Sequence, residues 1–201
     1  MPVAAAHAPL ITLAGVRRAL EGHAPRAAEA PGARPAAVAL VLVEAAGGVE
    51  LLFIRRAERA DDPWSGQVAF PGGRRGPGDP DLLATALRET REETGVDLAA
   101  AERLGVLDDL VPNTPTLPPV LVRPFVFALR ERPALAVERG EVARAFWVAL
   151  ARLAARGARQ DLVLTLRGGE RTFPAYRLGR DVIWGLTERI LTPFLTLVGV
   201  V

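Results

Sequence analysis

Hydrophobic and polar positions recur along this 201-residue chain with two different spacings, and each spacing predicts its own kind of element. Residues 36–56 hold two apolar runs around a Gly-Gly pair, which indicates an antiparallel hairpin. The first run is almost wholly apolar, as expected of a strand that is covered on both faces. Residues 10–22 and 80–94 carry apolar side chains at helical spacing. Further strands are expected over residues 103–107, 120–129, 143–148, 162–167 and 171–178, and further helices over 150–156 and 181–191.

Strands and helices interleave along the chain, and the sequence shows no internal repeat. This order favours an α/β fold in which a mixed sheet carries helices on its faces. The Ala- and Pro-rich stretch that begins at His23 is the best candidate for a linker. We therefore expect an N-terminal helical extension and linker over residues 1–34 and one domain over residues 35–201. Half of all residues are hydrophobic, which is enough for a sizeable core.

A long segment rich in Gly and Pro, residues 57–80, shows no apolar periodicity. A loop of this length inside a compact domain points to function. The helix that follows has a strong start signal, with Asp79 as N-cap and Pro80 as the first helical residue. Gly95 is a good C-terminal stop. The sequence therefore predicts a helix over residues 80–94 directly after the loop.

Three glutamates, Glu89, Glu92 and Glu93, lie along one edge of the apolar stripe of this helix, and Glu93 is turned into the margin of the stripe. The ordinary interpretation of such a group is a solvated acidic face. Against it, the carboxylates repel each other, the helix dipole disfavours negative charge near a C-terminus, and the buried side adds a desolvation cost. A divalent cation would offset all three costs. Clustered carboxylate oxygens are ligands that Mg²⁺ or Mn²⁺ prefers.

The loop that enters this helix, Phe70-Pro-Gly-Gly-Arg-Arg-Gly-Pro-Gly, combines glycines with arginines. Glycines let the backbone approach a ligand closely. Mg²⁺ usually keeps waters and binds through a few carboxylates together with substrate phosphates. The residues themselves therefore indicate metal-assisted chemistry on a phosphate ester or anhydride.

The same residues resemble a known family. The segment RETREETGV, residues 88–96, matches the second half of the Nudix box, which is written G-x5-E-x7-R-E-U-x-E-E-x-G-U with U aliphatic. Thr90 departs from this pattern at one U position. Upstream, Gly73 and Asp79 match the first half, with Asp in place of Glu. The gap from Asp79 to Arg88 is eight residues instead of seven.

The Nudix resemblance implies an α/β/α sandwich with a mixed β-sheet, and a hydrolase that cleaves a nucleoside diphosphate linked to another moiety. It also implies a divalent metal, Mg²⁺ with Mn²⁺ as the alternative, held by the strand–loop–helix box. Carried over position by position, the implied metal ligands are Glu89, Glu92, Glu93 and the carbonyl of Gly73. Arg88 would hold the glutamates in place. Helix capping is enough to explain Asp79.

A narrower resemblance concerns the coenzyme A pyrophosphatases, in which a motif of the approximate form LLTxRSx3Rx3Gx3FPGG precedes the box. Here the corresponding positions are Leu51-Leu52, Arg55 and Gly66-x3-Phe70-Pro71-Gly72-Gly73. The segment IWGLT near the C-terminus is similar to the closing helix of that branch. Phe53 replaces the Thr, Arg56 replaces the Ser, and the gap before Gly66 is about two residues too long.

Arginines of this region are candidates for binding substrate. Arg55, Arg59, Arg74 and Arg75 could grip a diphosphate and a ribose 3′-phosphate, because arginine forks suit phosphate oxygens. Phe70 of the same motif joins the expected substrate-binding set. The alternative is that these are ordinary surface residues, since the chain has no Lys and Arg is its only basic residue apart from His.

Two glutamates are candidates for the base that activates water. Glu89 lies in the box, but a glutamate that binds a metal has little free lone-pair capacity. Glu141 lies outside it, next to a flexible Gly140 just before the strand 143–148. The ordinary interpretation of Glu141 is a turn glutamate. The sequence leaves the choice open.

Charge and composition exclude several other functions. The chain has 25 basic and 23 acidic residues, and a net charge of +2 argues against a nucleic-acid partner. It has no Cys, which excludes thiolate chemistry and Cys-based metal sites. The apolar run 36–43 is too short for a membrane span, and the first residues do not read as a signal peptide. We expect a cytoplasmic protein whose partner is a small nucleotide, and the sequence leaves a homodimer open.

Two classes of function remain. The first is a Mg²⁺-dependent pyrophosphatase acting on coenzyme A or a related nucleoside diphosphate derivative. Within this class the alternatives are ADP-ribose, another nucleotide sugar, or a modified nucleoside triphosphate. The second class is a Nudix-fold nucleotide-binding module without catalysis. Such a module would be expected to lose box carboxylates, whereas all three are present here.

Overall fold

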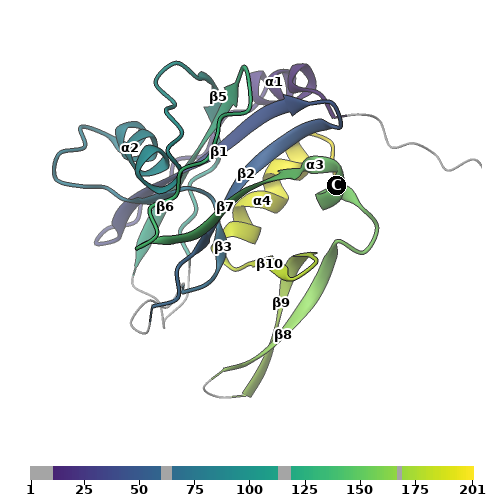
Figure 1. Cartoon of the computed structure of the whole chain (residues 1–201). Coiled ribbons are helices and arrows are strands. Elements are labelled where there is room, and N and C mark those ends of the chain that lie inside the picture. The colour runs from purple at the N-terminus through teal and green to yellow at the C-terminus, as the bar shows by residue number, and fades with distance from the viewer. Residues whose placement is uncertain (1–10, 60–64, 113–118, 167–168) are drawn as a thin grey trace, which may run out of the picture.

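The computed structural model describes residues 11–59, 65–112, 119–166 and 169–201 (Figure 1). Its helices are α1 (Leu13–Glu21), α2 (Leu82–Thr94), α3 (Leu150–Ala154) and α4 (Leu186–Leu197). Its strands are β1 (Arg34–Ala45), β2 (Gly48–Arg56), β3 (Val68–Ala69), β4 (Gly72–Arg74), β5 (Glu102–Val106), β6 (Val120–Leu129), β7 (Val142–Ala149), β8 (Arg159–Leu166), β9 (Gly169–Leu178) and β10 (Asp181–Trp184). Most predicted elements are confirmed to within a few residues, and the exceptions are given below.

The central sheet is mixed, as predicted. Its order is β3-β2-β1-β6-β5, with β4 paired to β1 and β7 paired to β2. β1 and β6 are parallel, in register from Arg34 opposite Val120 to Val43 opposite Leu129. The other pairs are antiparallel. β1 is central and buried along most of its length, which agrees with its almost continuous apolar sequence.

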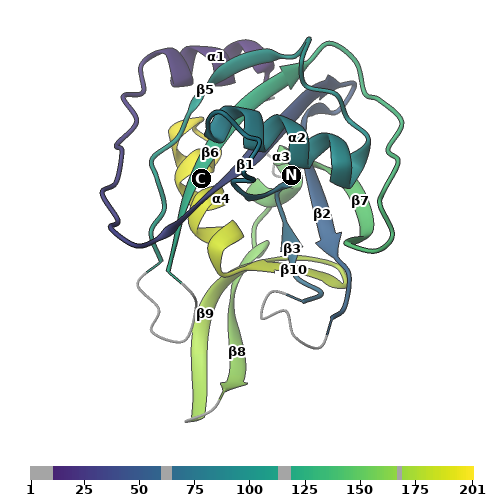
Figure 2. The ribbon, with the colours of Figure 1, turned by 90° about the vertical axis from the view of Figure 1, so that its left-hand side faces the viewer.

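Alternate residues of β1 face two different layers. Ala37, Ala39 and Val41 belong to the hydrophobic cluster beneath α2. Leu40 and Leu42 belong to the cluster that contains residues of α1, α3 and α4. Figure 2 shows α2 on one side of the sheet and α4 on the other. The mixed sheet between helical layers is the predicted α/β/α arrangement.

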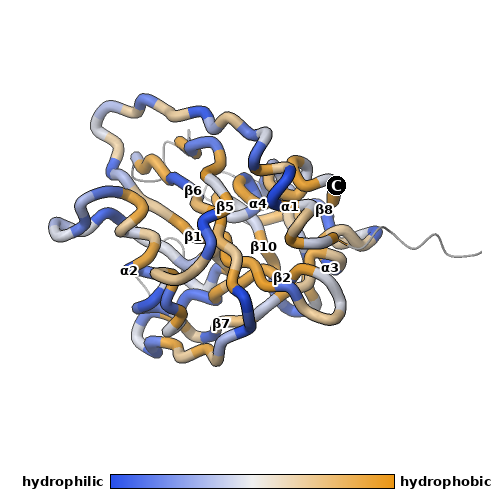
Figure 3. Tube along the Cα trace, turned by 90° about the horizontal axis from the view of Figure 1, so that it is seen from above, coloured by the Kyte–Doolittle hydropathy of each residue, from blue (hydrophilic) through white to orange (hydrophobic). Residues whose placement is uncertain are grey.

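Hydrophobic positions gather in the middle of the molecule, along β2 and its neighbours, and hydrophilic positions prevail in the outer segments (Figure 3). None of the helices in the described part of the chain is long and apolar enough to cross a membrane.

The N-terminal helix packs onto the domain, and the stretch after it is anchored. Leu13, Val16 and Leu20 of α1 are buried in the core. In the stretch expected to be a linker, the Ala28 N–H donates to the Asp109 carboxylate at 3.0 Å. The Asp109 N–H in turn donates to a carbonyl of the same stretch at 3.0 Å. The stretch expected to be a linker is therefore held against the domain.

Two predictions of local structure are corrected. The segment 57–80, expected to be a loop, contributes the short strands β3 and β4. The segment 181–191, expected to be one helix, is divided at Gly185 into β10 and α4, and Ile183 of β10 pairs opposite Tyr176 of β9. Gly185 has φ +67°, a left-handed conformation that glycine adopts readily. A short apolar run before such a glycine fits a strand as well as a helix.

Candidate active site

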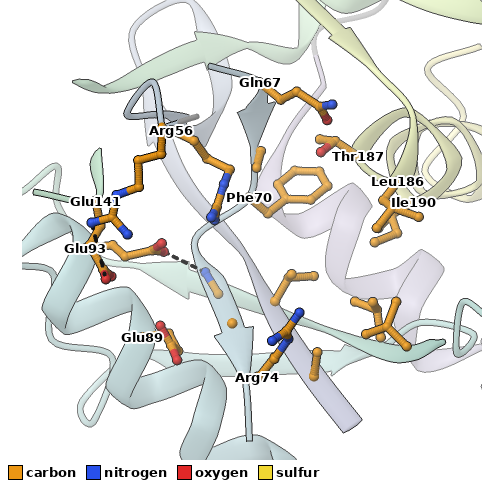
Figure 4. A pocket seen from close by; sticks show the side chains of 18 residues that line it. Arg56, Gln67, Phe70, Arg74, Glu89, Glu93, Glu141, Leu186, Thr187 and Ile190 are labelled. Carbon is orange, nitrogen blue, oxygen red and sulfur yellow. Dashed lines mark hydrogen bonds and ion pairs between the residues drawn. The ribbon is translucent and has the colours of Figure 1, made fainter. Parts of the chain in front are cut away.

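A cavity of about 530 Å³ opens between α2, the β1–β4–β6 part of the sheet and the start of α4 (Figure 4). It is lined by two of the three box glutamates, Glu89 and Glu93, and by Glu141 from the segment before β7. The predicted Gly73, Phe70, Arg59 and Arg74 also line it. Most of the residues expected from the sequence are therefore brought together at one place.

Glu93 is the most deeply buried acid of the cavity, with an exposed fraction of 3%. The Gly72 N–H donates a hydrogen bond to its carboxylate at 2.8 Å. Burial raises the pKa of Glu93 to about 8; the Gly72 hydrogen bond opposes this shift, and the neighbouring Glu89 reinforces it. Burial also raises the pKa of Glu89, against the effect of Arg88. A cation between these carboxylates would relieve both burial and repulsion.

The two glycines before α2 are required by close contacts. β4 pairs antiparallel with β1, so that Gly73 lies opposite Ala37. A Cβ on Gly73 would lie 2.5 Å from the carboxyl carbon of Glu89, and a Cβ on Gly72 would lie 2.3 Å from the Ala37 carbonyl oxygen. Any side chain would clash at these two positions. Because glycine has none, the Gly73 backbone can lie directly beside the Glu89 carboxylate.

Arg88 connects the acids of the site. Its guanidinium contacts Glu89 at 2.9 Å, Glu92 at 2.8 Å and Asp79 at 2.9 Å. The hydrogen bond with Asp79 is the main cause that raises the pKa of Arg88. Hydrogen bonds from Arg88 and from the Gly76 N–H hold the pKa of Asp79 well below its usual range. Arg88 thus contacts two of the three box glutamates, and its holding role in the active enzyme stays a prediction.

Asp79 is not the helix cap, which corrects the prediction that capping explains it. The N-cap of α2 is Asp81, whose side chain accepts from the Ala84 N–H at 2.8 Å, so Pro80 lies before the helix. Asp79 is buried and also accepts from the Thr85 hydroxyl at 3.0 Å. Its carboxylate binds the Arg88 guanidinium and so fixes the position of that side chain.

Glu92 is placed apart from the other two box glutamates. Its side chain is 57% exposed, and one of its carboxylate oxygens accepts from Arg88. Within the described residues, no three Asp, Glu, His or Cys side chains converge as a ready-made metal cage. Glu89, Glu93 and the Gly73 backbone still offer oxygen donors on one wall of the cavity. This set fits Mg²⁺, which binds through one or two carboxylates and keeps several waters.

Glu141 reaches the cavity from a different part of the chain. The Glu141 carbonyl accepts from the Ala57 N–H at 2.8 Å, which fixes this segment beside the end of β2. Its carboxylate is 57% exposed and lies 3.8 Å from the guanidinium of Arg59. Its negative charge contributes to the raised pKa values of Glu89 and Glu93. Glu141 is thus near the box acids while its carboxylate remains open to solvent.

The arginines are distributed differently from the expectation. Arg55 lies outside the cavity, where its guanidinium is 3.5 Å from the buried Asp181. Arg75 donates to the carbonyls of Asp79 and Pro80 and holds the loop instead of facing the cavity. Arg56, which was not among the candidates, lines the cavity. Neighbouring residues of a strand point to opposite faces, and this alternation could have identified Arg56.

The C-terminal helix, which the sequence analysis noted only through the similarity of IWGLT, forms one wall of the cavity. Leu186, Thr187 and Ile190 of α4 line the cavity together with Gln67, which precedes β3. Phe70 lines it as predicted, and its ring stacks on Phe53 at a centroid distance of 5.1 Å. The IWGLT similarity pointed to this helix, but only the tertiary fold shows that it packs beside the box.

Comparison with known proteins gives the family. The NUDIX domain family model matches residues 33–167. The chain belongs to the NUDIX family of hydrolases, which act on phosphoric anhydrides.

Several relatives of this family are similar to the chain. Mitochondrial coenzyme A diphosphatase NUDT8 of Homo sapiens is 35% identical over 169 residues, which are 81% of this chain and 69% of that protein. The uncharacterized Nudix hydrolase NudL of Photorhabdus laumondii is 35% identical over 63% of this chain and 66% of its own length. An uncharacterized protein of Schizosaccharomyces pombe is 42% identical over 107 residues, which are 51% of this chain and 32% of that protein.

Solved structures support the fold. A MutT/nudix family protein from Enterococcus faecalis has a TM-score of 0.55 at 19% identity, covering 89% of this chain and 71% of that protein. A bifunctional NMN adenylyltransferase/ADP ribose pyrophosphatase from Francisella tularensis has a TM-score of 0.52 at 18% identity, covering 86% of this chain and 44% of that protein. At these identities the likeness concerns the fold alone.

Proposed function

We propose that this protein hydrolyses the diphosphate linkage of coenzyme A or a closely related nucleoside diphosphate derivative, with Mg²⁺ as the cofactor. The observation that carries the substrate is its similarity to a coenzyme A diphosphatase over 81% of the chain. The cavity supports the reaction class, because it combines buried carboxylates with arginines from three segments.

The metal would be held by Glu89, Glu93 and the carbonyl of Gly73, and Glu92 would take part through Arg88 or through a change of its side-chain position. A bound divalent cation supplies a Lewis acid, which neutralises the phosphate charge and makes water more acidic. Burial raises the pKa of both Glu89 and Glu93, and a cation bound between the two carboxylates would favour their charged forms.

The remaining groups divide the other tasks. Arg74 is exposed at the cavity and is suited to bind phosphate oxygens. Arg59 lies beside Glu141, so it can bind phosphate and orient that carboxylate at once. Glu141 is our candidate to accept the proton of the attacking water, with Glu89 as the second candidate. The water oxygen adds to one phosphorus, the bridging oxygen leaves with the other phosphate, and the proton passes to the base.

The decisive experiment is mass spectrometry of the products formed from coenzyme A with Mg²⁺ and, as a control, with a chelator. We expect 3′,5′-ADP and 4′-phosphopantetheine in the first case and no turnover in the second. A panel should include ADP-ribose and modified nucleoside triphosphates. Much faster processing of ADP-ribose than of coenzyme A would overturn the substrate. Binding of these nucleotides without turnover would instead indicate a non-catalytic module.

A further inference from the structure

The cavity has two ends of different chemistry. Figure 4 shows Glu89, Glu93 and Glu141 on one side, and Gln67 and Thr187 at the opposite end. Leu186 and Ile190 of α4 lie beside Thr187 in the same view, and Val38 of β1 and Val122 of β6 add aliphatic groups to the lining of the cavity. A reacting diphosphate belongs at the acidic end, so the second end is available for a part of the substrate away from the reaction.

Two polar groups at the aliphatic end lack a partner. Thr187 is 93% buried, with an exposed fraction of 7%, and it faces the cavity. Gln67 is half-buried and lies next to the start of α4, because a Cβ on Gly185 would be 3.9 Å from its side-chain oxygen. Within the described chain, no hydrogen bond is formed by the Thr187 hydroxyl or by the Gln67 carboxamide. Both groups are therefore free to pair with a ligand in the cavity, and a ligand that covers them there must supply their hydrogen-bond partners.

The position of Thr187 is supported by a partly buried network that involves the next residue of α4, Glu188. The Thr192 hydroxyl donates to the Glu188 carboxylate at 2.8 Å and contacts the Tyr176 hydroxyl at 3.0 Å. Arg159 donates to the same carboxylate at 3.3 Å. These bonds tie the first turns of α4 to β8 and β9. Thr187 therefore presents its hydroxyl to the cavity from a rigid element, as a specificity group should be presented.

We propose that Thr187 and Gln67 form a subsite for the amide-bearing aliphatic chain that is attached to the diphosphate, the pantetheine arm if the substrate is coenzyme A. This inference rests on the proposed function. The Thr187 hydroxyl donates to an amide carbonyl of the chain, and the Gln67 side-chain oxygen accepts from an amide N–H. The aliphatic walls cover the methylene and methyl groups. The wall from α4 lies beyond residues 33–167 that the family model matches, so it can distinguish this chain from other members.

Two other occupants fit less well. A phosphate at the start of α4 would be opposed by the negative charge of Glu188 in the first turn of the helix, although that side chain does not line the cavity. An adenine ring is usually bound by stacking on an aromatic side chain, whereas this end is mainly aliphatic and Phe70 already stacks on Phe53. An amide-bearing chain satisfies both the polar pair and the walls.

The test uses the two product halves as probes and measures binding by calorimetry in the presence of Mg²⁺. Thr187→Val removes the hydroxyl and keeps the shape. We expect it to weaken 4′-phosphopantetheine binding about tenfold, the value of one hydrogen bond, and to leave 3′,5′-ADP binding within about twofold. Gln67→Leu should have the same selectivity. Thr187→Ser keeps the hydroxyl and should bind like the wild type, and Thr196→Val on the exposed side of α4 is the matched control.

The outcomes are separable from those of the proposed function. If coenzyme A is hydrolysed but Thr187→Val weakens 3′,5′-ADP instead, the aliphatic end holds the nucleotide half and the inference is overturned. Equal binding of both probes by Thr187→Val and the wild type also overturns it. If Thr187→Val weakens the binding of coenzyme A but not of dephospho-coenzyme A, the aliphatic end holds the 3′-phosphate and the inference is overturned. If the wild type fails to hydrolyse coenzyme A, it is the proposed function that has failed.

Discussion

Glu93 is an acid in an environment that disfavours its charged form. It is almost inaccessible, and burial raises its pKa to about 8. A single Gly72 N–H satisfies one of its oxygens. The charge of Arg56 opposes the effect of burial on Glu93 only in part. Such an environment is typical of functional sites.

We predict that Glu93→Gln lowers turnover by roughly a hundredfold or more at saturating Mg²⁺, because the metal loses a charged ligand. Without divalent metal, the variant should be as stable as the wild type or more so, since a neutral amide replaces a buried group whose ionisation is unfavourable. Steady-state kinetics and thermal unfolding with a chelator measure the two effects. Near-wild-type turnover of Glu93→Gln at saturating Mg²⁺ would show that the metal assignment is wrong.

Asp79 and Asp81 lie two residues apart and differ in role, which gives a matched pair of variants. Asp79→Asn should destabilise the fold by about 1–3 kcal/mol and reduce kcat, because Arg88 loses the buried one of its three charged partners. Asp81→Asn should be nearly neutral, since Asn is as good an N-cap as Asp. Denaturant unfolding and kcat measurements test both. Equal losses for the two variants would contradict the separate roles.

At the residue scale, the sequence revealed the carboxylates but not their supports. The spacing of Glu89, Glu92 and Glu93 located the box and the buried side of its helix. It could not distinguish Asp79 from Asp81 as the cap, because both are acids just before the first turn. The choice depends on the contact between Asp79 and Arg88, which forms only in the folded structure. The burial that separates Glu93 from the exposed Glu92 is likewise a property of the packed structure.

At the scale of elements, the segment between α1 and β1 is held by one buried acid. Asp109 accepts from the Arg123 guanidinium at 2.7 Å and from the Ala28 N–H at 3.0 Å, and its side chain is only 1% exposed. Burial opposes its ionisation, but the hydrogen bonds from Arg123 and Ala28 more than offset this and lower the pKa of Asp109. Its charged form therefore stabilises the folded state.

This acid predicts a pH dependence. Because its pKa is lower in the folded state, Asp109 contributes stability at pH values above about 3.9, its usual pKa, and the contribution is lost as the pH falls through the folded value. We expect Asp109→Asn to lower the free energy of unfolding by about 1–3 kcal/mol at neutral pH. Urea unfolding at pH 7 and near pH 3 should show the difference from the wild type narrowing in acid. A constant difference would refute this linkage.

Elements with a clear period were predicted well, and short apolar runs were not. β1 and β6 were evident because their buried sequences are long and continuous. The run before Gly185 is too short for its period to separate strand from helix, and its pairing with β9 decides it. β4 is built mainly from glycine and has no apolar signature, so only its pairing with β1 makes it a strand.

At the scale of the whole molecule, the cavity is assembled from segments that are far apart in the sequence. α2 supplies two acids, the segment before β7 supplies Glu141, and α4 supplies the opposite wall. Helix and strand periods carry no information on these distances. The family motif could therefore identify the box, while the aliphatic end needed the fold.

Glu141 gives the prediction that depends most on this assembly. A base must lie near the reacting water yet remain free to take a proton, and Glu141 lines the cavity while its carboxylate is 57% exposed. We predict that Glu141→Gln lowers kcat at least about tenfold, with little change in the Mg²⁺ concentration required. A base contributes only to the chemical step, whereas a metal ligand contributes to the chemical step and to metal binding. Glu170→Gln on β9 is the control. If kcat of Glu141→Gln equals that of the wild type from about pH 6 to 9, Glu141 is eliminated and the role returns to Glu89.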